Sequence, residues 1–339
     1  MLALAAMTQD PPDTAPPAPG RAAPDASGAP QRAPEASGPG EFGHAPVLPA
    51  ECLAALDVRP DGVYADVTLG GGGHSRLILD RLGPGGRLLA LDLDPEPLEW
   101  AGSWAGGDGR LILARGSFAR LGEILRERGL PPLDGILADL GASSRQMLSP
   151  SRGFTFSADG PLDMRLDPDG PLTAADLVNG LPEGELADLV YRLSGERASR
   201  KLARAIALRR RERPFSTTLD LAELARRVVR PPARGRRIHP ATRLFLALRM
   251  AVNREQEALA SFLGQARDCL LPGGRLAVIS FQSLEDRLVK DLFRPGPRDA
   301  PRLWIPLWKK PVVPGGPELS ANPRARSAKL RAAARAPGP

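Results

Sequence analysis

Apolar runs of strand length alternate with segments of helical spacing over the first half of the chain, starting near residue 44. Each apolar run is hydrophobic throughout rather than at every second position, so both faces of the sheet must be covered. Four strand–helix repeats of this kind predict an α/β fold with a doubly wound, mostly parallel, Rossmann-like sheet. The predicted strands are 62–69, 87–92, 110–114 and 133–139, and the predicted helices are 48–56, 74–82, 95–104 and 119–128.

This alternation breaks after residue 145. Residues 145–165 have the composition of a polar loop, and 173–230 have the spacing of several amphipathic helices. The spacing over 239–271 predicts one long helical stretch, and a buried strand returns over 272–280 after a Pro-Gly-Gly turn. We therefore predict an all-helical domain inserted into the sheet domain.

The two ends of the chain have a different composition. Residues 1–40 are mainly Ala, Pro, Gly, Ser and Asp, which cannot bury enough apolar surface to offset the entropy of ordering, so we expect disorder. The proline-rich 295–317 and the basic 322–335 predict an irregular tail. The predicted parts are thus a disordered extension (1–40), a first part of the sheet domain (41–145), a loop with the helical insertion (146–238), a second part of the sheet domain (239–295) and a proline-rich and basic tail (296–339).

Several classes of protein are disfavoured by the sequence. No apolar run approaches the ~18 residues of a membrane span, and the start of the chain lacks the basic region of a signal peptide. Two cysteines, Cys52 and Cys269, are too few for a disulfide scaffold or a multi-cysteine metal site, and we expect both to be small core residues. We expect a cytoplasmic protein with no metal and no membrane contact.

The charge balance favours a polyanionic partner. The chain has 46 basic and 39 acidic residues, and between 195 and 255 basic residues outnumber acidic ones roughly three to one. GC-rich codons also favour arginine, so part of this bias carries no information about partners. The candidates for phosphate contact are Arg209, Arg210, Arg211, Arg236 and Arg237 in the insertion and Arg324, Arg326, Lys329 and Arg331 in the tail.

A glycine-rich turn marks a candidate cofactor site. Four glycines (70–73) follow the first predicted strand, and Asp92 closes the next strand about 20 residues on, as expected for an acid that binds ribose hydroxyls. A dinucleotide site would need a third glycine where Ser75 stands. S-adenosylmethionine has no pyrophosphate and does not need that glycine, and its sites tend to carry an acid where Asp66 stands. S-adenosylmethionine is therefore the better fit.

Two further residues follow predicted strands and have two interpretations each. Phe118 either lies against an adenine face or packs in the core beneath the sheet edge. Asp139 ends the fourth strand, where α/β proteins keep reactive groups, and either binds the cofactor's amino group or faces the substrate.

Eight motifs that occur in a fixed order along the chain are more specific than a fold prediction. Through these motifs the chain closely resembles the ribosomal RNA small subunit methyltransferase H (MraW) family over about residues 44–335. The motifs are 44–48 (HAPVL), 66–75 (DVTLGGGGHS), 134–144 (DGILADLGASS), 152–156 (RGFTF), 160–165 (GPLDMR), 239–243 (HPATR), 280–287 (SFQSLEDR) and 322–331 (NPRARSAKLR).

The resemblance implies methylation of the exocyclic N4 amine of one cytidine in the decoding centre of 16S rRNA, near the P site. The partner would be 16S rRNA, within the small ribosomal subunit or a late assembly intermediate. The cofactor contacts that the resemblance implies are Gly72, Gly73, His74, Asp92, Phe118, Asp139 and Gln146. The chain departs from the family pattern at Gln282, at Leu246 and in Gly195-Glu196-Arg197, which lacks the usual second glutamate, and these departures bear on substrate contacts rather than on the cofactor set.

Methylation of a ring amine needs an acceptor for the amine's hydrogen bonds, because the nitrogen lone pair is delocalised into the base. The Asn/Asp-Pro-Pro-aromatic segment of other N-methyltransferases is absent, and residues 139–144 stand in its place. We hypothesise that Asp139, a neighbouring carbonyl or the Ser143 hydroxyl is the acceptor. Asp163 and Arg165 either shape the pocket or brace their loop.

Aromatic residues and histidines near these motifs also allow two interpretations. Phe154 and Phe156 either stack an extruded base or pack under the loop. His44 and His239 either contact RNA or cap local structure. Methylation at carbon 5 would need a thiolate, and neither cysteine lies at the edge of the fourth strand.

Two other functions are compatible with parts of the sequence. An NAD(P)-linked oxidoreductase would use a similar glycine turn, but Ser75 and the arginine-rich insertion disfavour it. A non-catalytic RNA-binding assembly factor could keep the fold without the activity, since fold alone does not fix function.

Overall fold

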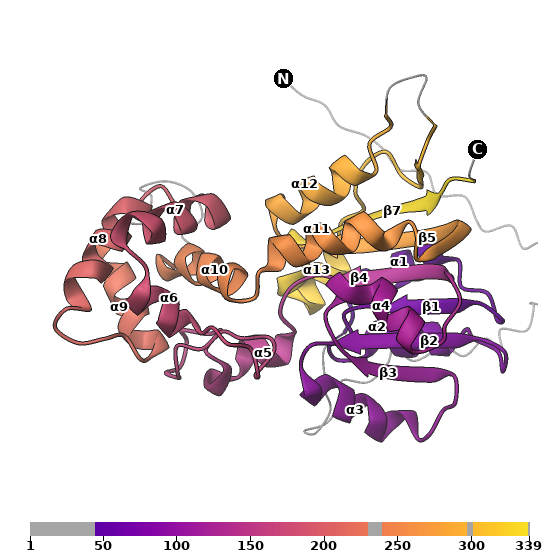
Figure 1. Cartoon of the computed structure of the whole chain (residues 1–339), viewed down its shortest axis with the longest axis horizontal. Coiled ribbons are helices and arrows are strands. Elements are labelled where there is room, and N and C mark those ends of the chain that lie inside the picture. The colour runs from indigo at the N-terminus through magenta and orange to yellow at the C-terminus, as the bar shows by residue number, and fades with distance from the viewer. Residues whose placement is uncertain (1–44, 230–238, 297–300, 338–339) are drawn as a thin grey trace, which may run out of the picture. The chain divides into compact units, whose positions relative to one another are not determined.

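The structure is a computed structural model that describes residues 45–229, 239–296 and 301–337 (Figure 1). The predicted disorder of 1–40, His44, Arg236 and Arg237 lie outside the described residues. The strands are β1 (Val63–Asp66), β2 (Arg87–Asp92), β3 (Leu111–Arg115), β4 (Leu133–Asp139), β5 (Leu270–Ser280), β6 (Trp304–Pro306) and β7 (Lys329–Arg335). The helices of the sheet domain are α1 (Pro49–Leu56), α2 (Gly73–Leu79), α3 (Pro95–Ala105), α4 (Leu121–Glu127), α11 (Glu255–Ala266), α12 (Ser283–Leu292) and α13 (Gly316–Ala321), with the short 3-10 turns η1 (Phe118–Arg120) and η3 (Pro323–Ser327).

The strands form one sheet in the order β3-β2-β1-β4-β5-β7-β6. The first five strands are parallel, and β7 pairs antiparallel with β5 on one side and β6 on the other. The predicted strands and helices of the first half are present, although β1 is shorter than expected. The predicted α/β class and mostly parallel sheet are confirmed.

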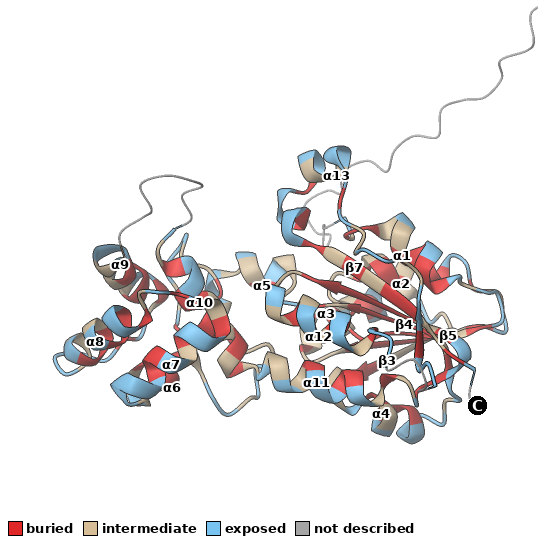
Figure 2. Ribbon diagram, turned by 90° about the horizontal axis from the view of Figure 1, so that it is seen from above, coloured by how far each residue is buried: buried red, intermediate tan, exposed pale blue. Residues whose placement is uncertain are grey.

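Successive residues of the central strands serve the two faces of the sheet in turn, as a fully covered sheet requires. Ile136 of β4 and Leu276 of β5 pack with α4, α11 and α12, whereas Leu137 and Ala277 pack with α1 and α2. Figure 2 shows the buried strands between α1 and α2 on one side and α4 and α11 on the other.

The inserted helices have an apolar core of their own. This core is formed by the helices α6 (Ala174–Gly180), α7 (Glu183–Ser194), α8 (Ser199–Arg209), α9 (Thr218–Val228) and α10 (Ala241–Val252). Phe154, Leu162 and Met164, from the loop that follows β4, join the same core. The loop after β4 is therefore anchored in the helical insertion. No helix in the described parts is long and apolar enough to cross a membrane.

The single helical stretch predicted over 239–271 is wrong, because the chain forms two helices there and β5 already begins at Leu270. The break lies at Arg254, whose φ of 47° is left-handed. Apolar spacing continues across the break because α10 packs in the insertion core and α11 packs on the sheet. The periodicity of apolar residues cannot show that the two helices pack against different parts of the protein.

The irregular tail predicted over 322–335 is also wrong, because Lys329–Arg335 is the buried strand β7. Its sequence, Lys-Leu-Arg-Ala-Ala-Ala-Arg, lacks the β-branched and aromatic residues that favour strands. Pairing on both edges, with β5 and β6, overrides this weak propensity. The proline-rich segment before it contributes the short strand β6 and helix α13.

Candidate cofactor and substrate cavity

A cavity of about 710 Å³ lies at the carboxyl ends of β1, β2 and β4, where α/β proteins bind ligands. One end is lined by the residues that follow β1, β2 and β3, namely Gly70, Gly71, Gly73, His74, Asp92 and Phe118. The other end is lined by the loop after β4, by α10 and by the start of α12, with Phe154, Phe156, Thr242, Phe245, Leu246 and Gln282, and Arg324 of η3 lines the cavity too. Asp139, Ser143 and Gln146 line the cavity as well.

The glycine turn is fixed by its own backbone and by Asp92. The Gly72 amide donates to the Leu69 carbonyl (2.8 Å), and the Gly70 amide donates to Oδ2 of Asp92 (3.0 Å). Gly72 has a φ of +75°, and a Cβ there would lie 3.0 Å from Cζ2 of Trp104. Both features favour glycine at this position. Gly72 itself does not line the cavity, so its missing side chain makes room for Trp104, whereas Gly70, Gly71 and Gly73 present the turn to the cavity.

Asp92 is tied to the backbone through both carboxylate oxygens. Oδ2 accepts from Gly70, and Oδ1 accepts from the Asp94 amide (3.0 Å). Burial raises the pKa of Asp92 to about 6, against the lowering effect of these hydrogen bonds. A carboxylate held in this way at the cavity wall suits hydroxyl groups of a ribose, as its spacing predicts.

His74 and Asp139 face each other across the wall of the cavity, with 3.9 Å between Nε2 of His74 and Oδ2 of Asp139. Burial lowers the pKa of His74 to about 4, so the imidazole is neutral. Burial, followed by the negative charges of Asp66 and Glu285, raises the pKa of Asp139 to about 8. Within the described structure, Nε2 of His74 and Oδ1 of Asp139 are buried without a hydrogen-bond partner. Unpaired buried polar atoms in a cavity wall fit a site whose partners arrive with a ligand.

Ser143 and Gln146 form the start of α5 (Ser144–Leu148). The Ser143 hydroxyl accepts from the Gln146 amide (3.3 Å), and Oε1 of Gln146 accepts from the Ser143 amide (2.9 Å), which is a capping box. Nε2 of Gln146 donates to Asp94 (2.8 Å). The two predicted site residues are thus held rigidly beside the cavity.

The three predicted aromatic residues all line the cavity and also pack against protein. Phe118 meets Phe262 edge to face at 5.5 Å, and Phe154 is buried in the insertion core. Phe156 stacks on His239 at 4.7 Å, and Nδ1 of His239 accepts from the Ala241 amide at the start of α10 (3.2 Å). Each ring therefore has a core contact and a side toward the cavity.

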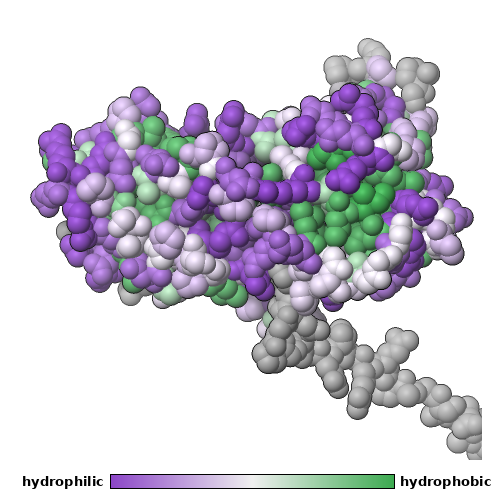
Figure 3. Space-filling view, turned by 60° about the horizontal axis from the view of Figure 1, so that its bottom comes forward, coloured by the Kyte–Doolittle hydropathy of each residue, from purple (hydrophilic) through white to green (hydrophobic). Residues whose placement is uncertain are grey.

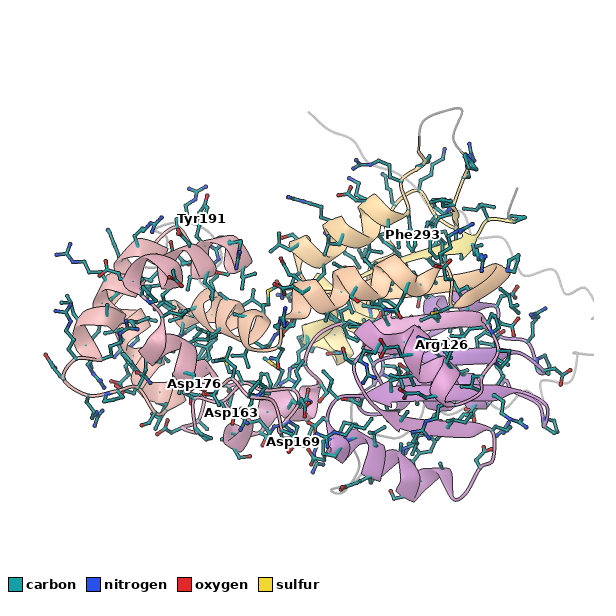
Figure 4. All side chains as sticks on the ribbon, in the orientation of Figure 1. Arg126, Asp163, Asp169, Asp176, Tyr191 and Phe293 are labelled. Atoms are coloured by element: carbon teal, nitrogen blue, oxygen red, sulfur yellow. The ribbon has the colours of Figure 1, made fainter. Side chains whose placement is uncertain are left out.

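Other predicted residues lie outside the cavity lining. Asp163 and Arg165 form a two-pronged ion pair (2.9 and 2.7 Å), and Arg165 also donates to the Gly170 carbonyl (2.8 Å). Figure 4 shows Asp163 in the same region as Asp169 and Asp176, and the charges of all three act on Arg165. These contacts brace the loop. Arg326, two residues after the cavity-lining Arg324, is exposed and does not line the cavity.

Several of the basic residues suggested for phosphate contact have partners in the protein. Lys329 and Arg331 pair with Asp286 (3.1 and 2.6 Å). Arg209 pairs with Asp220, and Arg210 donates to the carbonyls of Val178 and Leu181.

On the face shown in Figure 3, hydrophilic side chains predominate over the half that holds α6–α9, and a hydrophobic area lies over the half that holds the sheet.

The far end of the cavity contains residues that the sequence did not single out as site residues. Arg249 lines it and forms a two-pronged ion pair with Glu255 (2.8 and 2.9 Å), and both side chains are almost buried. Leu246 and Gln282, two of the departures from the family pattern, both line the cavity. Their departure from that pattern, which bears on substrate contacts, was the signal that could have placed them in the site.

No group of three or more His, Cys, Asp or Glu in the described ranges could hold a metal ion. Cys52 and Cys269 are buried, form no disulfide, and lie outside the cavity lining.

Comparisons with known proteins agree on one family. The model of the MraW methylase family matches residues 41–336. A ribosomal RNA small subunit methyltransferase H from Syntrophobacter fumaroxidans is 49% identical and covers 85% of this chain and 95% of its own. Proteins of the same name from Cyanothece sp. and Beijerinckia indica are 50% and 46% identical, over 87% and 92% of this chain and 95% and 91% of theirs. The solved structure of TrmN from Thermus thermophilus gives a TM-score of only 0.39 at 16% identity, over 85% of this chain and 48% of that chain, and bears on nothing here. The chain belongs to the MraW methylase family, and its cofactor is S-adenosylmethionine.

Proposed function

We propose that this protein transfers a methyl group from S-adenosylmethionine to the exocyclic N4 amine of a cytidine in the decoding centre of 16S rRNA. The observation that carries the proposal is one continuous cavity with the glycine turn and Asp92 at one end, aromatic residues at the other, and Asp139 in its wall. The names of the relatives, which act on small subunit ribosomal RNA, supply the class of substrate. We expect the reaction to take place in the cytoplasm, on the small subunit or a late assembly intermediate.

The cofactor end fits S-adenosylmethionine through this chain's own residues. Asp92 would bind ribose hydroxyls, and Phe118 would lie against the adenine. Gly72, Gly73 and His74 would contact the cofactor from the glycine turn. Gln146 and Asp139 would complete the set of cofactor contacts. When bound, the cofactor supplies a methyl group activated on a sulfonium.

The far end suits a base taken out of its stack. Enzymes that modify a base inside structured nucleic acid must extrude it into a pocket, where aromatic side chains stack on it. Phe154 and Phe156 line this end from the loop after β4, and Phe245 lines it from α10. Because Phe156 already stacks on His239 and meets Phe245, its orientation is fixed before any base enters.

Asp139 is our first candidate for the acceptor of the amine's hydrogen bond. A base works best when its pKa lies near the working pH, and the pKa of Asp139 is about 8. Its ionised carboxylate would accept a hydrogen bond from N4 and take the proton that the amine loses on methylation. Ser143, whose hydroxyl already accepts from the Gln146 amide, is the second candidate.

Arg324 is our candidate for contact with the RNA backbone beside the target. It lines the cavity, and in the described ranges its guanidinium forms no ion pair, whereas Arg249 is paired with Glu255. Arg326, also exposed, would contact RNA outside the cavity. Asp163 and Arg165 would support the pocket through their loop, since they bind each other.

Single-turnover methyl transfer to small subunits and to protein-free 16S rRNA tests the proposal. Asp139→Ala should slow transfer by about 10²–10⁴-fold, the usual contribution of a positioned base. Asp80→Ala, an exposed aspartate at the end of α2, and Ser103→Ala on α3 are matched controls that should leave the rate unchanged. Full rates in both Asp139→Ala and Ser143→Ala would refute the assignment of the acceptor. Cofactor binding without transfer to either substrate would favour a non-catalytic assembly factor.

A further inference from the structure

A buried carboxylate that the proposed reaction does not use lies close to the cavity. Asp94 precedes the first turn of α3, is 1% exposed and does not line the cavity. Its oxygens accept from three donors, which are the amide of Glu96 (3.2 Å), Nε2 of Gln146 (2.8 Å) and Nη1 of Arg152. Asp94 therefore does more than cap α3, because it ties that helix to the chain after β4.

The guanidinium of Arg152 extends this tie to the far wall of the cavity. Its Nη2 donates to the carbonyls of Arg165 and Leu166, each at 3.1 Å. The carbonyl of Arg152 accepts from the Met164 amide (3.1 Å). Met164 and Leu166 line the cavity, and so does Phe154, two residues after Arg152. One side chain thus joins α3 to both segments of the loop that form this wall.

The loop has a backbone that needs such support. Met164 has a left-handed φ of 66°, which a non-glycine residue keeps only where its surroundings enforce it. Asn253 holds it from α10 by donating to the Met164 carbonyl (2.8 Å) and accepting from the Leu166 amide (2.7 Å). The loop is therefore clamped between Arg152 on one side and Asn253 on the other.

The same network reaches the cofactor end. The amide of Asp94 donates to Asp92, and Asp92 accepts from Gly70 in the glycine turn. Hydrogen bonds therefore run without interruption from the glycine turn, through Asp92, Asp94 and Arg152, to the wall that holds Met164 and Leu166.

We propose that the ion pair between the buried Asp94 and the mostly buried Arg152 positions the 153–166 loop, and with it the base-binding wall, relative to the cofactor end of the cavity. The identity of the bound base rests on the proposed function. Asp94 and Arg152 are then positioning residues, because neither lines the cavity. Breaking this pair would leave the buried Asp94 carboxylate without its cation, which is costly, so the contact favours one position of the loop.

Kinetics of Arg152 variants test the proposal. A misplacement of about 1 Å costs about 100-fold in rate, so Arg152→Gln should lower kcat/KM for small subunits by about that factor. The Kd for S-adenosylmethionine should stay within about threefold, because Asp92 is held by the backbone amides of Gly70 and Asp94, which Arg152→Gln leaves in place. The kcat/KM of Arg152→Lys should lie between those of wild type and Arg152→Gln. The lysine keeps the positive charge, but one ammonium cannot replace a guanidinium that reaches Asp94 and two carbonyls. If Asp94→Asn and Arg152→Gln act on one pair, the double variant should be no slower than the slower single one.

Arg115 provides the matched control. It joins the end of β3 to the residues directly after this loop, through Asp167 (2.7 Å) and Asp169 (2.5 Å), but its side chain is 41% exposed. Exposed pairs contribute little, so Arg115→Gln should change kcat/KM by less than about threefold.

Hydrogen exchange in the cofactor-free protein gives a readout that does not depend on activity. The amides of Met164 and Leu166 should exchange faster in Arg152→Gln and at the wild-type rate in Arg115→Gln. Tryptophan fluorescence shows whether the sheet domain of Arg152→Gln is still folded. Partial rescue of the exchange rate in Arg152→Lys shows that the faster exchange comes from the lost contacts and not from unfolding. Wild-type exchange together with wild-type kcat/KM in Arg152→Gln would overturn the proposal. Faster exchange in a protein whose wild type transfers no methyl group would support the positioning role and refute the proposed function alone.

Discussion

Replacing Asp139 with asparagine should stabilise the protein relative to wild type by an amount that grows as the pH rises, and it removes the carboxylate that we propose takes the proton of the amine. Asp139 has a pKa of about 8 in the folded protein, whereas an unfolded carboxyl titrates near 4. The folded protein therefore keeps a proton that the unfolded chain has released, and its stability falls as the pH rises from about 4 to about 8. The slope is about 1.4 kcal/mol per pH unit, or about 3 kcal/mol between pH 5 and pH 7. Asparagine has no such proton, so Asp139→Asn should gain that amount relative to wild type.

Urea unfolding followed by tryptophan fluorescence measures this difference in the right part of the protein. All four tryptophans, Trp100, Trp104, Trp304 and Trp308, lie in the sheet domain with Asp139. Asp92, whose pKa is about 6, titrates in both proteins, so its effect cancels when the two are compared at each pH. A stability difference that changes by less than about 0.5 kcal/mol between pH 5 and pH 7 would refute the reasoning, because that is the size of an ordinary surface effect.

Two further predictions concern stability and are measured by urea unfolding with far-UV circular dichroism. Glu255→Ala should cost about 3–5 kcal/mol because it leaves Arg249 buried without a partner, whereas Glu223→Ala, whose ion pair on α9 is exposed, should cost less than about 1 kcal/mol. Equal losses would contradict the burial argument. Gly160→Ala should cost about 1–3 kcal/mol, because its Cβ would lie 1.9 Å from a backbone oxygen of the loop, and a neutral result would mean that the loop adapts freely. Its control, Gly184→Ala on α7, meets nothing within 4 Å and should gain about 0.5–1 kcal/mol.

The contact of Arg324 with RNA has its own salt test. Arg324→Ala should reduce the slope of log affinity against log salt by about one unit and raise KM for small subunits, as loss of a single phosphate contact does. Arg126→Ala on α4 is the control, because that exposed arginine does not line the cavity and is not among the proposed RNA contacts, and it should leave the salt slope and KM for small subunits nearly unchanged. An identical loss in both variants would refute a special position for Arg324.

The parallel half of the sheet could be predicted because its signals are local. Apolar runs closed by glycine or by Asp92 and Asp139 mark both the strands and the edge where the site lies. Asp139 and the glycine turn could therefore be predicted as site residues from the sequence alone. Ser75, in place of the third glycine of a dinucleotide site, pointed to the cofactor that the family uses.

Features that depend on long-range pairing could not be predicted. On a continuous helix, residues six positions apart point in different directions, so the pattern over 239–271 separates Arg249 from Glu255. The left-handed turn at Arg254 brings them together. The Asp94–Arg152 pair likewise spans 58 positions and leaves no periodic signal.

The identity of the methylated nucleoside tests the central claim most directly. Small subunits that lack the modification are incubated with the protein and labelled S-adenosylmethionine, and the rRNA is digested to nucleosides for mass spectrometry. We predict that the label appears in N4-methylcytidine from one cytidine of the decoding centre and disappears with Asp92→Ala. Label in 5-methylcytidine or in another nucleoside, or no label from a protein that still binds the cofactor, would contradict the account.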